Sequence, residues 1–124
     1  MTAFIVFAHG SRIESANEAV RQVSRQFADR TGYPVEPAFL ELGEPNLSGA
    51  VDRLANLGAQ RIVVLPYFLT LGTHMQRDLP QLAGHAAARH GNLSISVAAP
   101  LEGHPALLEA LWDRAGAALA GGPF

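Results

Sequence analysis

Short apolar runs of β-type residues alternate with stretches of helical periodicity, and this alternation limits the possible folds more than any other feature. The runs cover residues 3–8, 35–41, 61–65 and 93–98. After each run, apolar residues recur every three or four positions, as on one face of a helix. Strands that alternate with helices predict a parallel sheet. We therefore expect an α/β fold: an open parallel four-stranded sheet with helices on both faces, in a three-layer αβα arrangement.

The helical stripes and their stop signals place the helices between these runs. The stripes consist of Ala16, Val20, Val23 and Phe27; Leu47, Val51, Leu54 and Ala55; a third helix near 75–90; and Leu108, Leu111, Ala115 and Leu119. Gly32, Gly58 and Gly91 follow the first three stripes as helix stops. The second apolar run contains Pro37, which has no backbone donor and therefore predicts an edge strand.

The composition narrows the class of protein further. A chain of 124 residues, 48% hydrophobic and 16% charged, predicts one folded domain over 1–124, with a frayed tail at about 120–124. A net charge of −2 gives no electrostatic reason to bind nucleic acid. We see no signal peptide and no apolar stretch near the roughly 20 residues of a membrane helix. The chain has no cysteine, which excludes thiolate metal sites and fits a cytoplasmic protein.

Polar residues follow the strands at the edge where parallel sheets bind ligands. In chain order they are His9, Glu41, His74, and, after the last strand, Glu102 and His104. We expect Gly10 and Ser11, directly after His9, to open a helix whose N–H groups face the same crevice. Each residue also has a structural interpretation: His9 as a turn residue, Glu41 as a solvated edge carboxylate, and His74 or His104 as a helix cap. The sequence alone leaves these alternatives open.

Taken together, His9, His74 and Glu41 offer two imidazole nitrogens and one carboxylate at neighbouring strand ends. Such a set suits Co²⁺, Ni²⁺, Zn²⁺ or Fe²⁺ in an open site. We therefore predict that these three residues form a binding site for a divalent metal. The chain has no GxxxxGK[ST] phosphate loop and no GxGxxG after the first strand, so we expect no nucleotide cofactor.

Four stretches of this chain, in this order, resemble one family. "HGSR", "FLELGEPNL", "RIVVLPYFLTLGTH" and "PLEGHP" are similar to the short class II, ATP-independent sirohydrochlorin chelatases, and the match covers roughly residues 3–115. The resemblance implies a chelatase-like domain that inserts a divalent metal, Co²⁺ first and Ni²⁺ or Fe²⁺ as alternatives, into sirohydrochlorin. It thus implies a lyase of cobalamin-type or sirohaem-type tetrapyrrole biosynthesis, with metal and tetrapyrrole as substrates.

The resemblance also implies roles for individual residues. The family's two metal-binding histidines fall on His9 and His74, and its active-site glutamate falls on Glu41. Members with two such units in one chain imply that a single unit forms a homodimer. The segment before the second histidine departs from the family, because "LGTH" stands where a run of smaller residues is common.

We expect the substrate to contact two groups of residues. The carboxylates of the macrocycle need donors, and its rings need apolar surface. The predicted substrate-binding residues are Gly10, Ser11, Arg12, Phe68, Leu69, Gly72 and Thr73. Arg12 could instead lie on a solvated face, and Phe68 could belong to the core. The alternative function is a metal-binding or tetrapyrrole-binding protein without turnover, while a histidine phosphatase is disfavoured because Ala8, not arginine, precedes His9.

Overall fold

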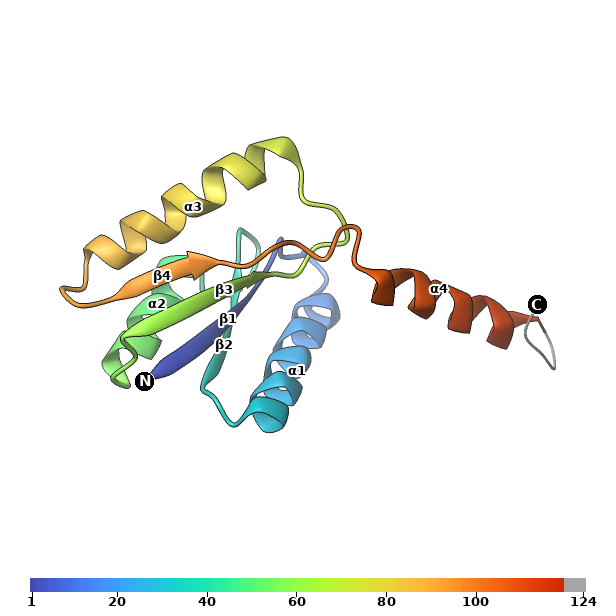
Figure 1. Ribbon diagram of the computed structural model, residues 1–124, viewed down its shortest axis with the longest axis horizontal. Helices are drawn as coiled ribbons and strands as arrows, with labels where there is room; N and C mark the ends of the chain where they lie inside the picture. Colours follow the sequence, from blue (N-terminus) through green and yellow to red (C-terminus); the bar gives the residue numbers. More distant parts are fainter. Residues whose placement is uncertain (120–124) are drawn as a thin grey trace.

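The computed structural model describes residues 1–119, and the expected tail at 120–124 lies outside them. Strands and helices alternate along the chain as expected (Figure 1). The elements are β1 (Thr2–Ala8), α1 (Glu14–Thr31), β2 (Val35–Phe39), α2 (Leu47–Asn56), β3 (Arg61–Pro66), α3 (Thr73–Ala88), β4 (Ser94–Val97) and α4 (Pro105–Ala118). Within residues 1–119, no helix is both long enough and apolar enough to span a membrane.

The four strands form one parallel sheet in the order β2-β1-β3-β4. β1 lies between two neighbours, and its residue Phe7 pairs with Ala38 on one side and Pro66 on the other. This position explains the continuous apolar sequence of β1, because a central parallel strand is covered on both faces. β2 lies at the edge, as Pro37 predicted.

Helices cover both faces of the sheet. On one face, α2 and α3 pack over a core that contains Ile5, Ile62 and Val64. On the other face, α1 packs over a smaller cluster formed around Val6 and Phe39. Figure 1 shows α3 and α1 on opposite sides of the sheet. The expected three-layer α/β arrangement is therefore confirmed.

Three element boundaries differ from the sequence prediction, and each difference moves a candidate residue. β2 ends at Phe39, so Glu41 lies in the loop after the strand. α3 begins at Thr73, which places His74 in its first turn rather than in the preceding loop. α1 begins only at Glu14, so Gly10 and Ser11 form a loop and do not open the helix. The left-handed backbone of Gly10, with φ +96°, is incompatible with a helical start there.

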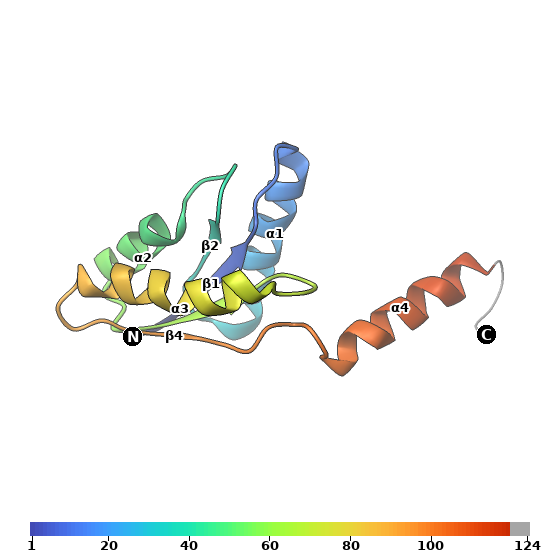
Figure 2. The same ribbon diagram turned by 90° about the horizontal axis from the view of Figure 1, so that it is seen from above.

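The last helix stands apart from the layers. All 14 residues of α4 are described, and none of them is buried. Both views show α4 projecting away from the sheet, beyond the end of β4 (Figures 1 and 2). The side chain of His104 caps this helix, because its Nδ1 accepts the N–H of Ala106 at 3.0 Å. The structural interpretation of His104 is thus confirmed.

Candidate functional site

The loops after β1 and β2 are joined by backbone hydrogen bonds that extend the parallel ladder. The N–H of Leu40 donates to the carbonyl oxygen of Ala8 at 2.9 Å, and the N–H of Glu41 donates to that of His9 at 3.1 Å. The pairing therefore continues two residues beyond the end of β2. These backbone hydrogen bonds fix the Cα positions of His9 and Glu41, so the two residues are neighbours across the extended ladder.

Gly10 allows this close approach. A Cβ atom built on Gly10 would collide with the backbone carbonyl oxygen of Glu41. The positive φ of Gly10 is also one that residues with side chains rarely adopt. The glycine after His9 is therefore required by the packing of one loop against the other.

A buried asparagine of α1 joins the same two loops through hydrogen bonds. Asn17, in the first turns of α1, is 1% exposed. Its Oδ1 accepts the N–H of Ser11 at 2.9 Å, and its Nδ2 donates to the carbonyl oxygens of Ser11 and Leu42, each at 2.9 Å. One side chain thereby holds the loop that carries His9 and the loop that carries Glu41. Leu42 adopts a positive φ of 59°, which this contact helps to maintain.

The side chains of His9 and Glu41 face each other at the carboxyl edge of the sheet. The distance from His9 Nε2 to Glu41 Oε1 is 3.9 Å, and the two side chains are 59% and 57% exposed. The other ring nitrogen, Nδ1, lies 3.3 Å from the carbonyl oxygen of Gly10. A carbonyl oxygen only accepts hydrogen bonds, so Nδ1 is the donor in this contact, and Nε2 is the ring nitrogen that faces Glu41.

Aromatic rings support His9 on its other side. The ring of Phe68 stands edge-to-face against the imidazole, with centroids 6.5 Å apart. Phe68 in turn contacts Phe7 at 6.0 Å and packs against the main core. Phe68 therefore belongs to the core and also borders the candidate site; that it contacts the substrate remains a prediction.

His74 belongs to a different environment. Its Nδ1 accepts a hydrogen bond from the guanidinium of Arg77, one turn along α3, at 3.1 Å. Among residues 1–119, no three histidine, aspartate or glutamate side chains gather closely enough to hold a metal ion. The structure thus joins His9 to Glu41 but does not bring all three predicted ligands together. That His74 binds the same ion remains a prediction.

The predicted substrate contacts differ in their availability. The N–H of Ser11 is already bound to Asn17, and its Oγ accepts the N–H of Ile13 at 3.0 Å, which leaves the hydroxyl proton to donate. Arg12 is exposed beside them. The sequence argument missed Asn17, although a polar residue at position 17 on the same helix face as Val20 was a usable signal.

The loop between β3 and α3 supplies apolar surface. Tyr67, Phe68 and Leu69 line a shallow groove of about 270 Å³ together with two leucines, Leu101 and Leu107. Leu69 is 73% exposed. The predicted residues Gly72 and Thr73 start α3: Gly72 is the N-cap, and Thr73 is exposed in the first turn.

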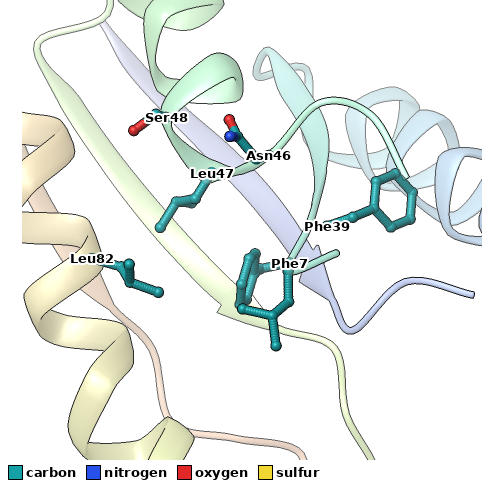
Figure 3. Close-up of a pocket in the computed structure, with 7 residues that line it drawn as sticks. Phe7, Phe39, Asn46, Leu47, Ser48 and Leu82 are labelled. Atoms are coloured by element: carbon teal, nitrogen blue, oxygen red, sulfur yellow. The ribbon is translucent and has the colours of Figure 1, made fainter. Parts of the chain in front are cut away.

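A second hollow lies between the start of α2 and α3. It measures about 160 Å³ and is lined by Phe7, Phe39, Leu40, Asn46, Leu47, Ser48 and Leu82 (Figure 3). No histidine or carboxylate lines it. Sites for organic ligands commonly have 300–1,000 Å³. This hollow is too small for a tetrapyrrole, so the exposed edge around His9 is the better candidate.

Comparison with known proteins gives matches over nearly the whole chain. The CbiX family model matches residues 3–118. The chloroplastic sirohydrochlorin ferrochelatase of Arabidopsis thaliana is 40% identical over 111 residues, which are 89% of this chain and 49% of that protein. The sirohydrochlorin cobaltochelatase of Methanocaldococcus jannaschii is 35% identical over 91 residues, or 73% of this chain and 64% of that protein. The chain thus spans about half to two thirds of the length of these relatives.

Solved structures agree with this match. The CbiX protein of Marinobacter aquaeolei VT8 superimposes with a TM-score of 0.85 at 28% identity, covering 96% of this chain and 98% of that one. The sirohydrochlorin chelatase SirB of Bacillus subtilis subspecies spizizenii, solved in complex with cobalt, superimposes with a TM-score of 0.83 at 27% identity. That alignment covers 92% of this chain and 49% of SirB. The family model and the relatives together show that this chain belongs to the CbiX family.

Proposed function

We propose that this protein inserts a divalent metal ion into sirohydrochlorin without ATP. The observation that carries the proposal is the His9–Glu41 pair: an imidazole nitrogen and a carboxylate that face each other at an exposed edge. The names of the relatives support the substrate, since they are sirohydrochlorin chelatases. They differ in the metal, with iron in one name and cobalt in another. We favour Co²⁺, with Ni²⁺ and Fe²⁺ as the alternatives.

His9 is prepared to hold the incoming metal. Histidine ligands of metals usually donate their second ring N–H to a carbonyl or carboxylate, which fixes the tautomer. The contact between His9 Nδ1 and the Gly10 carbonyl does this. Nε2 and the Glu41 carboxylate then form a nitrogen and oxygen pair that attracts a cation. In this proposal His74 is the second imidazole, and its Nδ1 has to leave Arg77 before that atom can bind.

Insertion also requires that two pyrrole protons leave the macrocycle. The Glu41 carboxylate is exposed and can accept a proton and pass it to water. Bonds from the metal to the protein are replaced by bonds from the metal to ring nitrogens. The charge of the macrocycle balances because one divalent ion enters and two protons leave. Because the ligands are few and exposed, the metal can transfer out of the site.

The macrocycle would lie over the open edge of the sheet. Phe68 and Leu69 offer apolar surface for its rings. The Ser11 hydroxyl, the Gly10 N–H and Arg12 are the donors that we assign to its carboxylates. The structure has an open surface here, which suits a flat, rigid substrate better than an enclosed pocket of ordinary size. We retain the cytoplasm as the predicted location, although the Arabidopsis relative is named as chloroplastic.

The test follows the visible spectrum of sirohydrochlorin mixed anaerobically with Co²⁺ and a catalytic amount of protein. We expect the free-base bands to convert over many turnovers. A chain with both His9→Ala and His74→Ala should give only the background rate. The matched control is His85→Ala, which removes an exposed histidine from the same α3 helix and should leave the rate unchanged. Repeating the assay with Ni²⁺ and Fe²⁺ ranks the metals.

Two results would contradict the proposal. A single spectral change in proportion to the protein would indicate the alternative, a binding protein without turnover. Equal rates for the wild type and the double variant would show that the two histidines do not handle the metal.

A further inference from the structure

The imidazole of His9 makes only weak polar contacts. Its Nδ1 lies 3.3 Å from the carbonyl oxygen of Gly10 and its Nε2 lies 3.9 Å from Glu41, and the side chain is 59% exposed. Both distances are longer than those of a strong hydrogen bond. Backbone bonds fix the Cα atom of His9 but not its side-chain torsions, and exposed side chains exchange rotamers readily. A further contact is therefore needed to keep Nε2 turned towards Glu41.

The sheet places Phe68 on the other side of His9. Because β1 is a central strand, the loop after it has one neighbour on the β2 side and one on the β3 side. On the β3 side, the N–H of Tyr67 donates to the carbonyl oxygen of Phe7 at 2.7 Å, which continues the pairing one residue beyond the end of β3. Phe68 comes next and leaves the sheet beside His9, as Glu41 does on the β2 side. The imidazole therefore stands between a carboxylate and an aromatic ring.

The rings of His9 and Phe68 meet in a geometry that aromatic pairs prefer. Their centroids are 6.5 Å apart and their planes are inclined at 87°. Edge-to-face pairs of aromatic rings have centroids about 4.5 to 7 Å apart. This contact depends on the angle between the two planes, so a rotation of the imidazole about its side-chain torsions loses it. An aliphatic side chain of similar size has no such preference for one ring orientation.

The core holds the ring of Phe68 in its own place. Its centroid lies 6.0 Å from that of Phe7, which is 1% exposed, and the ring packs against the main hydrophobic cluster. The next residue, Leu69, is instead 73% exposed. A ring that the core fixes on one side can orient an exposed neighbour on its other side. Phe68 meets this condition, and Leu69 does not.

From these observations we infer that Phe68 is a positioning residue for His9. Its ring keeps the imidazole in the orientation in which Nε2 faces Glu41. Phe68 thereby raises the affinity for the metal through His9, without touching the metal itself. The effect on the metal rests on the proposed function, whereas the effect on the orientation of the ring does not. Neither effect requires that Phe68 also contact the macrocycle, which is a separate prediction.

The first test observes the His9 side chain by NMR in the full chain, without metal or tetrapyrrole. His9→Ala identifies the signals by their disappearance, and three-bond couplings report the χ1 torsion. We expect the couplings of a single rotamer in the wild type and in Phe68→Tyr, which keeps the ring. Phe68→Leu should give couplings averaged over several rotamers. Averaged couplings in the wild type, or a single rotamer in Phe68→Leu, would overturn the inference.

The second test measures the affinity for Co²⁺ alone by calorimetric titration. Phe68→Leu should weaken binding about three- to tenfold, as expected for the loss of one aromatic contact. Phe68→Tyr should bind as the wild type does. The matched control is Phe4→Leu, which removes a half-buried ring of the same sheet from its contacts with Phe27 and Tyr33, each at 5.5 Å. It loses similar packing far from His9 and should leave the affinity for Co²⁺ unchanged.

A double-variant cycle then shows whether Phe68 acts through His9. In a chain that already carries His9→Ala, Phe68→Leu should change the affinity for Co²⁺ little, because the residue that it positions is absent. Equal weakening in both backgrounds would refute the inference, and so would a Phe68→Leu variant that binds Co²⁺ normally and only raises the KM for sirohydrochlorin. A wild type that binds no Co²⁺ would contradict the proposed function, and the couplings of His9 would still decide the inference.

Discussion

The two histidines assigned to the metal differ in how the fold holds them. His9 follows the central strand, and its loop is fastened by backbone bonds to Glu41 and by the buried side chain of Asn17. His74 lies in the first turn of α3, where its Nδ1 accepts an exposed hydrogen bond from Arg77. His9 Nε2 faces Glu41 across 3.9 Å, whereas His74 Nδ1 already accepts the hydrogen bond from Arg77.

This difference has a chemical consequence for a protein that passes metal to another molecule. A site in which every ligand is rigid and prearranged releases its ion slowly, because no ligand can move away as the metal is transferred. One fixed ligand pair with one adjustable ligand can capture an ion and then release it. In the proposed function the site combines these properties: the loops that carry His9 and Glu41 are held in place, and His74 has to exchange its partner. The following variants test that division.

The largest effect is expected from Gly10→Ala. The new methyl group would collide with the Glu41 carbonyl and would occupy a backbone conformation with φ +96°. Strain and steric overlap of this kind cost about 3 to 5 kcal/mol. Unfolding in urea should show this loss of stability. Gly72→Ala is the control in the other loop, because its Cβ meets nothing within 4 Å and the residue has φ −62°. Equal losses in both variants would contradict the distinction between the loops.

A smaller but still large effect is expected from Asn17→Ala. It removes three hydrogen bonds and leaves the N–H of Ser11 and the carbonyl of Leu42 without this partner. The loss of these partly buried hydrogen bonds costs about 2 to 4 kcal/mol. The rate of metal insertion under conditions where the variant is folded should also fall, because the His9 and Glu41 loops lose their link. Ser24→Ala is the control, because it removes a buried hydroxyl from the same helix. It should lower the stability but leave the rate of metal insertion unchanged.

Much of the fold and both members of the His9–Glu41 pair follow from patterns that the sequence displays directly. The apolar run before His9 predicted a covered strand, and the strand proved to be central in the sheet. Pro37 predicted an edge strand, since a missing donor is a local property that tertiary structure does not change. The carboxyl ends of parallel strands meet at one edge, so the proximity of His9 and Glu41 was also predictable.

Other features depend on contacts between distant segments, which periodicity does not encode. The role of Asn17 requires knowing that Leu42 lies above α1, 25 residues further along. The stripe of α4 predicted a helix but could not say which surface covers it. Similarly, the position of Gly10 next to a carbonyl delays the start of α1, although "HGSR" resembles a helix entry. Local sequence patterns predict the helices and strands, whereas the packing of loops against one another determines the geometry of the candidate site.

A third histidine provides a reference with a structural role. His90 donates to Asp52 at 2.8 Å, and Arg89 donates to the same carboxylate at 2.6 Å. The bond from His90 first, and that from Arg89 next, hold the pKa of the Asp52 carboxyl below its usual value of 3.8. The associated stability is therefore present above about pH 4 and is lost as the pH falls below it. Asp52→Asn should reduce this acid-dependent loss by up to about 1 kcal/mol, as measured by urea unfolding at pH 3 and pH 7. A variant as acid-sensitive as the wild type would contradict this; the rate of metal insertion at pH 7 should not change.

The smallest change in stability, with an informative change in binding, is expected from Arg77→Ala. Arginine has only donors, so its bond to His74 requires that Nδ1 accept and that a neutral ring carry its proton on Nε2. Arg77 therefore competes with a metal for His74 and adds a repelling charge beside it. Removing the guanidinium should tighten Co²⁺ binding about fivefold, the equivalent of one ordinary hydrogen bond, while stability changes by less than about 0.5 kcal/mol. Calorimetric titration with Co²⁺ measures the first and urea unfolding the second. The same change in a His74→Ala background should have little effect on binding. Weaker binding in Arg77→Ala would mean that the arginine orients His74 for the metal, and the adjustable ligand would then be as prearranged as His9.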